Sequence, residues 1–223
     1  MAKFNIVGAG PGSPEYVTPL ARKTVQQADL VIGAQRSLNL FAEDIKGEKM
    51  FLNAKNLGSL LKLAAGLTRR GKNVALLSTG DPGFSGLLHT VLESGLLTPE
   101  QINVVPAVSS VQACAAKLAL NWDNAVLFTF HEGNVDDDQK LVLDFAVSSG
   151  QDVIVLPDPK AFAPKNISAY LIGKGRDKNT PVYVCENLTL PNEKITASTL
   201  EEVSKQTFEA LSVMVIKAKN EEK

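Results

Sequence analysis

Short apolar runs alternate with segments of helical periodicity along most of the chain, and this alternation limits the possible folds more than any other feature. The clearest apolar run, NVALLS at 73–78, is followed by a helical pattern at about 84–93. Strands that alternate with helices pair in parallel, because each crossover returns the chain to the same end of the sheet. In the first half we expect strands at 4–7, 29–33, 49–52, 73–78 and 102–105 and helices at 18–28, 56–70, 84–93 and 108–118.

The pattern starts again after Trp122–Asp123–Asn124, and the last strands differ from the others. The runs at 194–199 and 211–217 flank only a short helical segment at 200–204, which favours antiparallel pairing there. The chain is therefore expected to be an α/β protein with a domain at 1–120 around a mainly parallel sheet and a domain at 121–223 around a mixed sheet. In the second domain we expect further strands at 125–130, 152–156 and 181–186 and helices at 137–148 and 163–173.

Composition excludes several classes of protein. The 23 Lys and Arg residues are balanced by 24 Asp and Glu residues, so the basic excess typical of a nucleic-acid binder is missing. No apolar run approaches the 18 or so residues of a membrane span, and the N-terminus lacks a secretory pattern, so we expect a cytoplasmic protein. Two cysteines and two histidines, widely spaced, favour neither a disulfide framework nor a resident metal centre. Cys114 and Cys185 are expected to be ordinary buried residues.

Three loops follow expected strand ends in the first half. They are Gly8–Ser13, Ser78–Phe84 and Pro106–Gln112. In open α/β sheets, ligands bind beyond the carboxyl ends of the strands. We therefore expect all three loops to face one ligand site.

The first loop, GAGPGS, resembles a dinucleotide fingerprint only superficially. Pro11 and Pro14 remove two N–H donors, and the next helix begins only near Thr18, too far for a pyrophosphate held at a helix N-terminus. An acid is also missing at the end of the second strand, which closes on Gly33–Ala34. The remaining alternatives are a tight turn that needs glycine, or a bare loop on which a bulky ligand lies.

The other two loops have local as well as ligand-binding interpretations. Asp81 can cap a helix with Pro82 in its first turn, or its carboxylate can serve a ribose or amino-acid group. Ser109 and Ser110 can cap the next helix, or hold a polar ligand. The sequence leaves both pairs of alternatives open.

Taken together, GAGPGSP, TGDPGF and PAVSSVQ in this order resemble the tetrapyrrole methylase family, which uses S-adenosylmethionine. The resemblance covers nearly the whole chain and includes Glu186–Asn187–Leu188. LNWDNAVLFTFHEG and APKNISAYLI are most similar to the branch that methylates C5 of a corrin precursor in cobalamin biosynthesis. One departure is Ala107, where the family commonly has glycine. The resemblance implies a two-domain fold with a ligand cleft between the domains, S-adenosylhomocysteine as product and a homodimer.

The resemblance also implies roles for particular residues. The acetate and propionate groups of the macrocycle are anionic, so a basic side chain is expected beside it, and Arg36 follows the second strand. His131 is a candidate for proton transfer or a ligand contact, or is a structural histidine. The donor is expected at Pro11, Gly80, Asp81, Phe84, Ser109, Ser110, Leu156 and Pro157, and the macrocycle at Gly10, Gly12 and Arg36.

Methyl transfer from a sulfonium needs mainly positioning and exclusion of water, which agrees with the lack of an acid–base pair or triad in the sequence. The resemblance further implies a separate partner protein that methylates C15 and removes a carboxyl group. Three alternatives are a family member acting at another ring carbon, one acting on a modified histidine of a protein, and a nucleotide-binding module without catalysis.

Overall fold

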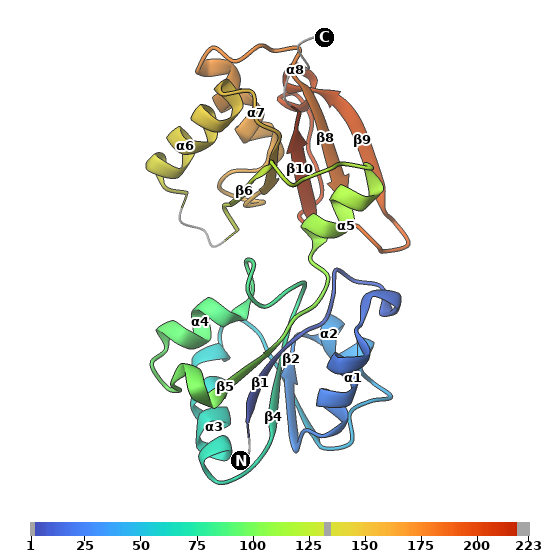
Figure 1. Cartoon of the computed structure of the whole chain (residues 1–223), viewed down its shortest axis with the longest axis vertical. Helices are drawn as coiled ribbons and strands as arrows, with labels where there is room; N and C mark the ends of the chain where they lie inside the picture. The colour runs from blue at the N-terminus through green and yellow to red at the C-terminus, as the bar shows by residue number, and fades with distance from the viewer. Residues whose placement is uncertain (1–2, 132–134, 218–223) are drawn as a thin grey trace. The chain divides into compact units, whose positions relative to one another are not determined.

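The computed structural model describes residues 3–131 and 135–217, and its contacts divide the chain into two units, Met1–Ser110 and Val111–Lys223 (Figure 1). The sequence predicts a boundary between 120 and 121, whereas this division falls after Ser110. The difference is due to the helix α5 (Ser110–Lys117), which from Val111 on is grouped with the second unit. The amine of Lys117, for example, lies 2.8 Å from a carboxylate oxygen of Glu193.

The first unit is built on a five-stranded sheet in which every pair of strands is parallel, as predicted. Its strand order, β3-β2-β4-β1-β5, brings the first and fourth strands together in the middle of the sheet. The strands are β1 (Phe4–Gly8), β2 (Leu30–Gly33), β3 (Glu48–Phe51), β4 (Val74–Ser78) and β5 (Ile102–Val105).

Helices cover both faces of this sheet (Figure 1). One face, with Phe4 and Ile6, packs against α3 and α4, and the other, with Val7 and Val31, packs against α1 and α2. A parallel sheet that is buried on both faces explains why its strands are continuous apolar runs. The helices are α1 (Pro19–Gln26), α2 (Gln35–Leu40), α3 (Leu57–Arg69) and α4 (Leu87–Glu93), with short 3-10 helices η1 (Pro14–Tyr16) and η2 (Pro99–Gln101).

Local signals explain where the helices begin. Thr18 caps α1 by accepting the N–H of Ala21 at 3.1 Å, and Pro19 occupies the first helical position, next to the expected start of this helix at residue 18. The helix α4 begins at Leu87 and not near Phe84, because the backbone turns at Ser85, whose φ is 53°. The sequence did not predict α2, which has only six residues and therefore shows little periodicity.

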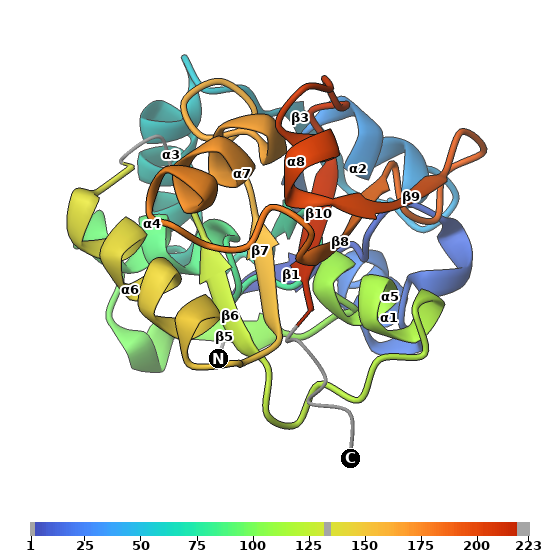
Figure 2. The ribbon, with the colours of Figure 1, turned by 90° about the horizontal axis from the view of Figure 1, so that it is seen from above.

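The second unit contains a mixed five-stranded sheet, again as predicted, with the order β6-β7-β10-β8-β9. The pair β6–β7 is parallel and the other three pairs are antiparallel. Side chains of α6, α7 and α8 share one core with the sheet, while α5 lies on the opposite side (Figure 2). The elements are β6 (Val126–Thr129), α6 (Asp137–Ser148), β7 (Val153–Leu156), α7 (Pro164–Gly173), β8 (Pro181–Glu186), β9 (Lys194–Thr199), α8 (Leu200–Val203) and β10 (Ser212–Ile216).

The two cysteines meet in this second unit, between α5 and β8. Both are free and fully buried, which agrees with the expected burial. The thiol of Cys114 donates a hydrogen bond to the sulfur of Cys185 at 3.3 Å, a contact that the sequence did not predict. This hydrogen bond raises the pKa of Cys114 and lowers the pKa of Cys185. Within residues 3–131 and 135–217, no helix is long and apolar enough to span a membrane.

Candidate functional site

The candidate site lies at the carboxyl ends of the strands of the first unit. Because the strands are parallel, the loops that follow β2, β4, β1 and β5 emerge at the same edge, in that order. The expected ligand residues thus form a row, with Arg36 after β2 at one end. Gly80–Asp81 and Gly8–Gly12 lie in the middle, and Ser109–Ser110 lies at the other end after β5.

Backbone hydrogen bonds join the two middle loops. The N–H of Ala9 donates to the carbonyl of Ser78 at 2.8 Å, and the N–H of Gly80 donates to the carbonyl of Gly10 at 2.9 Å. The side chain of Ser13 caps η1, and α1 begins only at Pro19. The glycine loop therefore does not lead into a helix as a dinucleotide fingerprint requires.

Asp81 ties the loop after β4 to the loop after β5. Its Oδ1 accepts the N–H of Gly83 at 2.8 Å, and its Oδ2 accepts the N–H of Ala107 at 2.9 Å. The helix-cap interpretation of Asp81 is wrong, because the residue that precedes α4 is Gly86. The carboxylate instead holds two loops in one arrangement.

Gly8 allows these loops to approach one another closely. A Cβ on Gly8 would lie 2.5 Å from the Cβ of Ala107 and 2.9 Å from the carbonyl oxygen of Gly80, closer than real Cβ atoms come. The methyl group of Ala107, the departure from the family pattern, therefore faces a glycine that leaves room for it.

Gly80 leaves open space at the centre of the row. Its φ is +67°, a conformation that glycine adopts without strain, and no atom of the described residues lies within 4 Å of where a Cβ would be. Pro11 and Ser109 are buried, while Phe84 and Ser110 are partly exposed. Bare backbone beside hydroxyl groups and an aromatic ring fits a nucleoside with a short polar chain, so the residues present are suited to S-adenosylmethionine.

Arg36 is partly buried in the first turn of α2. Within the described part of the chain, its guanidinium has neither a hydrogen bond nor an ion pair. Partial burial lowers the pKa of Arg36 below its ordinary value. The row thus ends in a cation that lacks a protein counter-ion among the described residues.

The remaining predicted residues lie in the second unit, at the carboxyl ends of β6 and β7. Leu156 pairs with Thr129 across these strands and Pro157 follows it, while His131 is exposed two residues after β6. The structure therefore brings His131, Leu156 and Pro157 to one edge of the second sheet.

The sequence did not point to Asp158, which belongs to this edge. Its Oδ1 accepts the N–H groups of Ala161 at 2.7 Å and Lys160 at 2.8 Å, and its side chain is largely buried. The N–H of Ala161 contributes most to holding the pKa of Asp158 below its usual range, and the charge of His131 adds to this. The sequence signal that could have identified Asp158 was an acid two residues after the end of an expected strand.

Glu186 and Asn187, which the sequence singled out, are both buried; Glu186 is the last residue of β8 and Asn187 follows it. Glu186 accepts the N–H of Glu209 at 2.8 Å, while the amine of Lys194 is 3.6 Å from its other oxygen. Asn187 has a φ of 51° and Thr189 a φ of 67°, so the turn is strained. These contacts give Glu186 a structural role in closing the end of β8.

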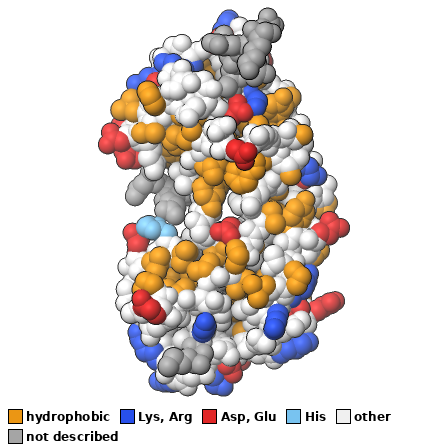
Figure 3. Space-filling model, in the orientation of Figure 1, with side chains coloured by type: hydrophobic (Ala, Val, Ile, Leu, Met, Phe, Trp, Pro, Cys, Tyr) orange, Lys and Arg blue, Asp and Glu red, His pale blue; other side chains and the backbone are white. Residues whose placement is uncertain are grey.

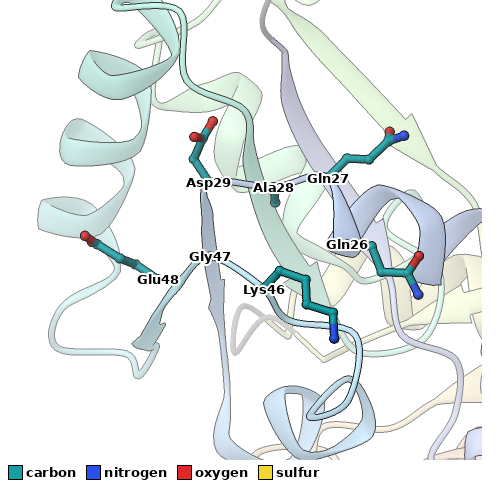
Figure 4. A pocket seen from close by; sticks show the side chains of 7 residues that line it. All are labelled: Gln26, Gln27, Ala28, Asp29, Lys46, Gly47 and Glu48. Carbon is teal, nitrogen blue, oxygen red and sulfur yellow. The ribbon is translucent and has the colours of Figure 1, made fainter.

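A pocket of about 590 Å³ lies elsewhere in the first unit, at the amino ends of β2 and β3 (Figure 4). Asp29 there bonds Lys72 at 3.0 Å and the N–H of Asn73 at 2.8 Å. Charged side chains of both signs and hydrophobic ones are scattered over the face drawn in Figure 3. The pocket contains none of the predicted residues, and its lining residues are Gln26, Gln27, Ala28, Asp29, Lys46, Gly47 and Glu48.

Comparisons with known proteins identify the family to which the chain belongs. The family model described as Tetrapyrrole (Corrin/Porphyrin) Methylases matches residues 3–204. The chain is 38% identical, over 97% of its length and 98% of the relative's, to a probable cobalt-precorrin-7 C(5)-methyltransferase of Methanocaldococcus jannaschii. A solved cobalt-precorrin-4 methyltransferase is 26% identical with a TM-score of 0.79, covering 96% of this chain and 94% of that one. A Thermus thermophilus uroporphyrin-III C-methyltransferase solved with S-adenosylhomocysteine is 23% identical, with a TM-score of 0.77 and 97% of each chain covered, and shares the fold.

Proposed function

Because the chain belongs to the tetrapyrrole (corrin/porphyrin) methylases, we propose that it methylates C5 of the corrin precursor cobalt-precorrin-7. The methyl donor is S-adenosylmethionine and the product is S-adenosylhomocysteine. The choice of C5 is supported by the relative that is 38% identical over nearly the whole of both chains. The structural observation that carries the proposal is the row of hydrogen-bonded loops around the open space at Gly80.

The donor is proposed to bind along the middle of this row. Gly80 offers backbone without a side chain, and Asp81 holds the neighbouring loops in place. Phe84 supplies an apolar surface beside them, and Ser109 and Ser110 supply hydroxyl groups. Bound S-adenosylmethionine supplies a methyl group that is already activated by its positive sulfur. Leu156 and Pro157 are proposed as further donor contacts from the second unit.

The acceptor is proposed to lie against the glycine loop after β1, with Gly10 and Gly12 as its contacts. Both glycines are buried, and Gly10 is fixed by its hydrogen bond to Gly80. The loops then hold the electron-rich carbon of the acceptor in line with the methyl group. Positioning of this kind lowers barriers by about 7–11 kcal/mol, so a strong acid–base pair is not required.

One proton must still leave the ring carbon that receives the methyl group. His131 is proposed to accept it, because its ring is exposed and its surroundings include the buried carboxylate of Asp158. Because the imidazole is exposed, it can then pass the proton directly to water, without a second titratable residue.

Two measurements test the proposed function. Calorimetry should show micromolar binding of S-adenosylhomocysteine and no binding of NAD; the reverse pattern would refute a methyltransferase. The isolated corrin intermediate is then incubated with donor carrying a labelled methyl group, and the new methyl is located by NMR. A label on C11 or another ring carbon would overturn the assignment to C5 and keep the family activity.

A further inference from the structure

Arg36 is distinguished from the other cations of the first unit by its surroundings. Arg22 forms an ion pair with Asp44 at 2.6 Å, and Lys72 forms one with Asp29 at 3.0 Å. The guanidinium of Arg36 is partly buried and has no such partner among residues 3–131 and 135–217. A partly desolvated charge without a partner is unfavourable, so a counter-ion from a ligand would stabilise it.

Two acids on neighbouring elements, Asp44 and Asp81, are already engaged. Asp44, at the end of the segment after α2, uses one oxygen for Arg22 and the other for the amide of Gln26, 2.8 Å away. Asp81, at the next strand end, uses both oxygens for backbone N–H groups. Neither carboxylate neutralises Arg36, which leaves its donors for an anion from outside.

The position of Arg36 also fits a ligand that reaches the glycine loop. The strand order places β4 between β2 and β1, so the ends of β2 and β1 are two strand spacings, about 10 Å, apart. A tetrapyrrole ring with acetate and propionate arms is wide enough to extend over such a distance. Its edge would then meet Arg36 while its face lies on Gly8–Gly12.

We propose that Arg36 binds a peripheral carboxylate of the macrocycle and thereby sets how the acceptor lies on the row. This inference rests on the proposed function, since it takes the acceptor to be a carboxylated tetrapyrrole. The planar guanidinium can hold a carboxylate through two parallel hydrogen bonds, which a lysine cannot do. Arg36 is therefore a positioning residue for the acceptor and does not contact the donor.

The experiment uses the full chain and three variants, Arg36→Gln, Arg36→Lys and the control Arg70→Gln. Arg70 is an exposed cation at the C-terminal end of α3, and the chain from there enters β4 at its amino end, away from the row. The two glutamine variants change the net charge equally. Fluorescence titration measures the binding of a porphyrin octacarboxylate and of a tetracationic porphyrin, calorimetry measures S-adenosylhomocysteine, and thermal denaturation measures stability.

Arg36→Gln should weaken the octacarboxylate about tenfold to a hundredfold, since a hydrogen bond between charged groups is lost. Arg36→Lys should lie between it and the wild type, and Arg70→Gln should stay within about threefold, as exposed charges contribute little. S-adenosylhomocysteine binding should not change in any variant. The melting temperature of Arg36→Gln should not fall, because no hydrogen bond or ion pair among the described residues is removed.

Equal effects of Arg36→Gln and Arg70→Gln would overturn the proposal, because they would show only a change in overall charge. A loss of affinity for both porphyrins, or a fall in melting temperature, would also overturn it and assign Arg36 a structural role. Failure of the proposed function is a separate result. In that case the wild type binds the octacarboxylate through Arg36 but does not bind S-adenosylhomocysteine.

Discussion

Replacing Asp81 by alanine tests whether the loops that it joins form the donor site. The substitution removes the acceptor of two N–H groups, of which that of Gly83 is exposed and that of Ala107 is partly buried. Water can replace the carboxylate at Gly83 but only incompletely at Ala107. With hydrogen bonds to charged groups contributing about 1.5–3 kcal/mol when buried and less when exposed, we expect the free energy of unfolding to fall by about 2 kcal/mol.

Donor affinity should fall by more than this. Both loops belong to the row, so their release disturbs several proposed contacts at once, including those of Gly80 and Ser109. A loss greater than about 2 kcal/mol corresponds to an increase of more than about thirtyfold in the Kd of S-adenosylhomocysteine. Calorimetry measures this Kd, and urea denaturation of the same samples measures stability.

Asp29→Ala is a matched control. Asp29 also accepts a backbone N–H, from Asn73, but it lies at the amino end of β2, on the opposite edge of the same sheet. This variant should lose stability and keep the wild-type Kd. The reasoning is refuted if Asp81→Ala loses about 2 kcal/mol of stability while its Kd stays within about threefold of the wild type. Asp81 would then only join the loops, and the donor would bind elsewhere.

Three further predictions concern the second unit. His131→Gln should lower kcat at least about tenfold and leave the Kd of S-adenosylhomocysteine unchanged, because the proposed role of His131 is to accept a proton and not to bind the donor. An unchanged kcat would make His131 a structural histidine. Asp158→Asn should be less stable than the wild type near neutral pH. Because folding lowers the pKa of Asp158, its contribution is present above the unfolded value of about 4 and is lost as the pH falls through the lower folded value. Urea denaturation at several pH values should therefore show the two proteins converging in acid, and a constant difference would contradict this. Cys114 and Cys185 should react slowly with a thiol reagent in the native protein and both rapidly in denaturant, because both are fully buried. Rapid labelling of either thiol in the native protein would contradict this prediction.

The elements that the sequence predicts best are those whose apolar pattern decides their structure. The apolar run NVALLS contains β4. The prediction of a mixed second sheet is also confirmed, since the last strands are not joined by the long crossovers that parallel pairing needs. The helix α1 begins where Thr18 and Pro19 indicate. The helix α2 has too few residues to show a period.

The site is predicted only in part, for a physical reason. Parallel strands place their carboxyl ends at one edge, so the meeting of the three loops follows from the alternation of strands and helices. The particular contact of Asp81 with Ala107 does not follow, since it joins residues from two loops whose separation depends on the strand order. The contact of Cys114 with Cys185 was not predicted for the same reason, because no local sequence pattern determines which helix packs on which strand.

The close approach of Gly8 and Ala107 has a consequence for how these two positions can vary. A methyl group fits on one side of the contact only, so alanine at both positions would force the loops apart. Exchanging the two residues would relieve that collision but would still leave a side chain 2.9 Å from the carbonyl of Gly80 and 3.0 Å from the ring of Pro82. Substitution is therefore tolerated in one direction: position 107 can gain or lose a methyl group in evolution, while position 8 is held at glycine by the backbone around it.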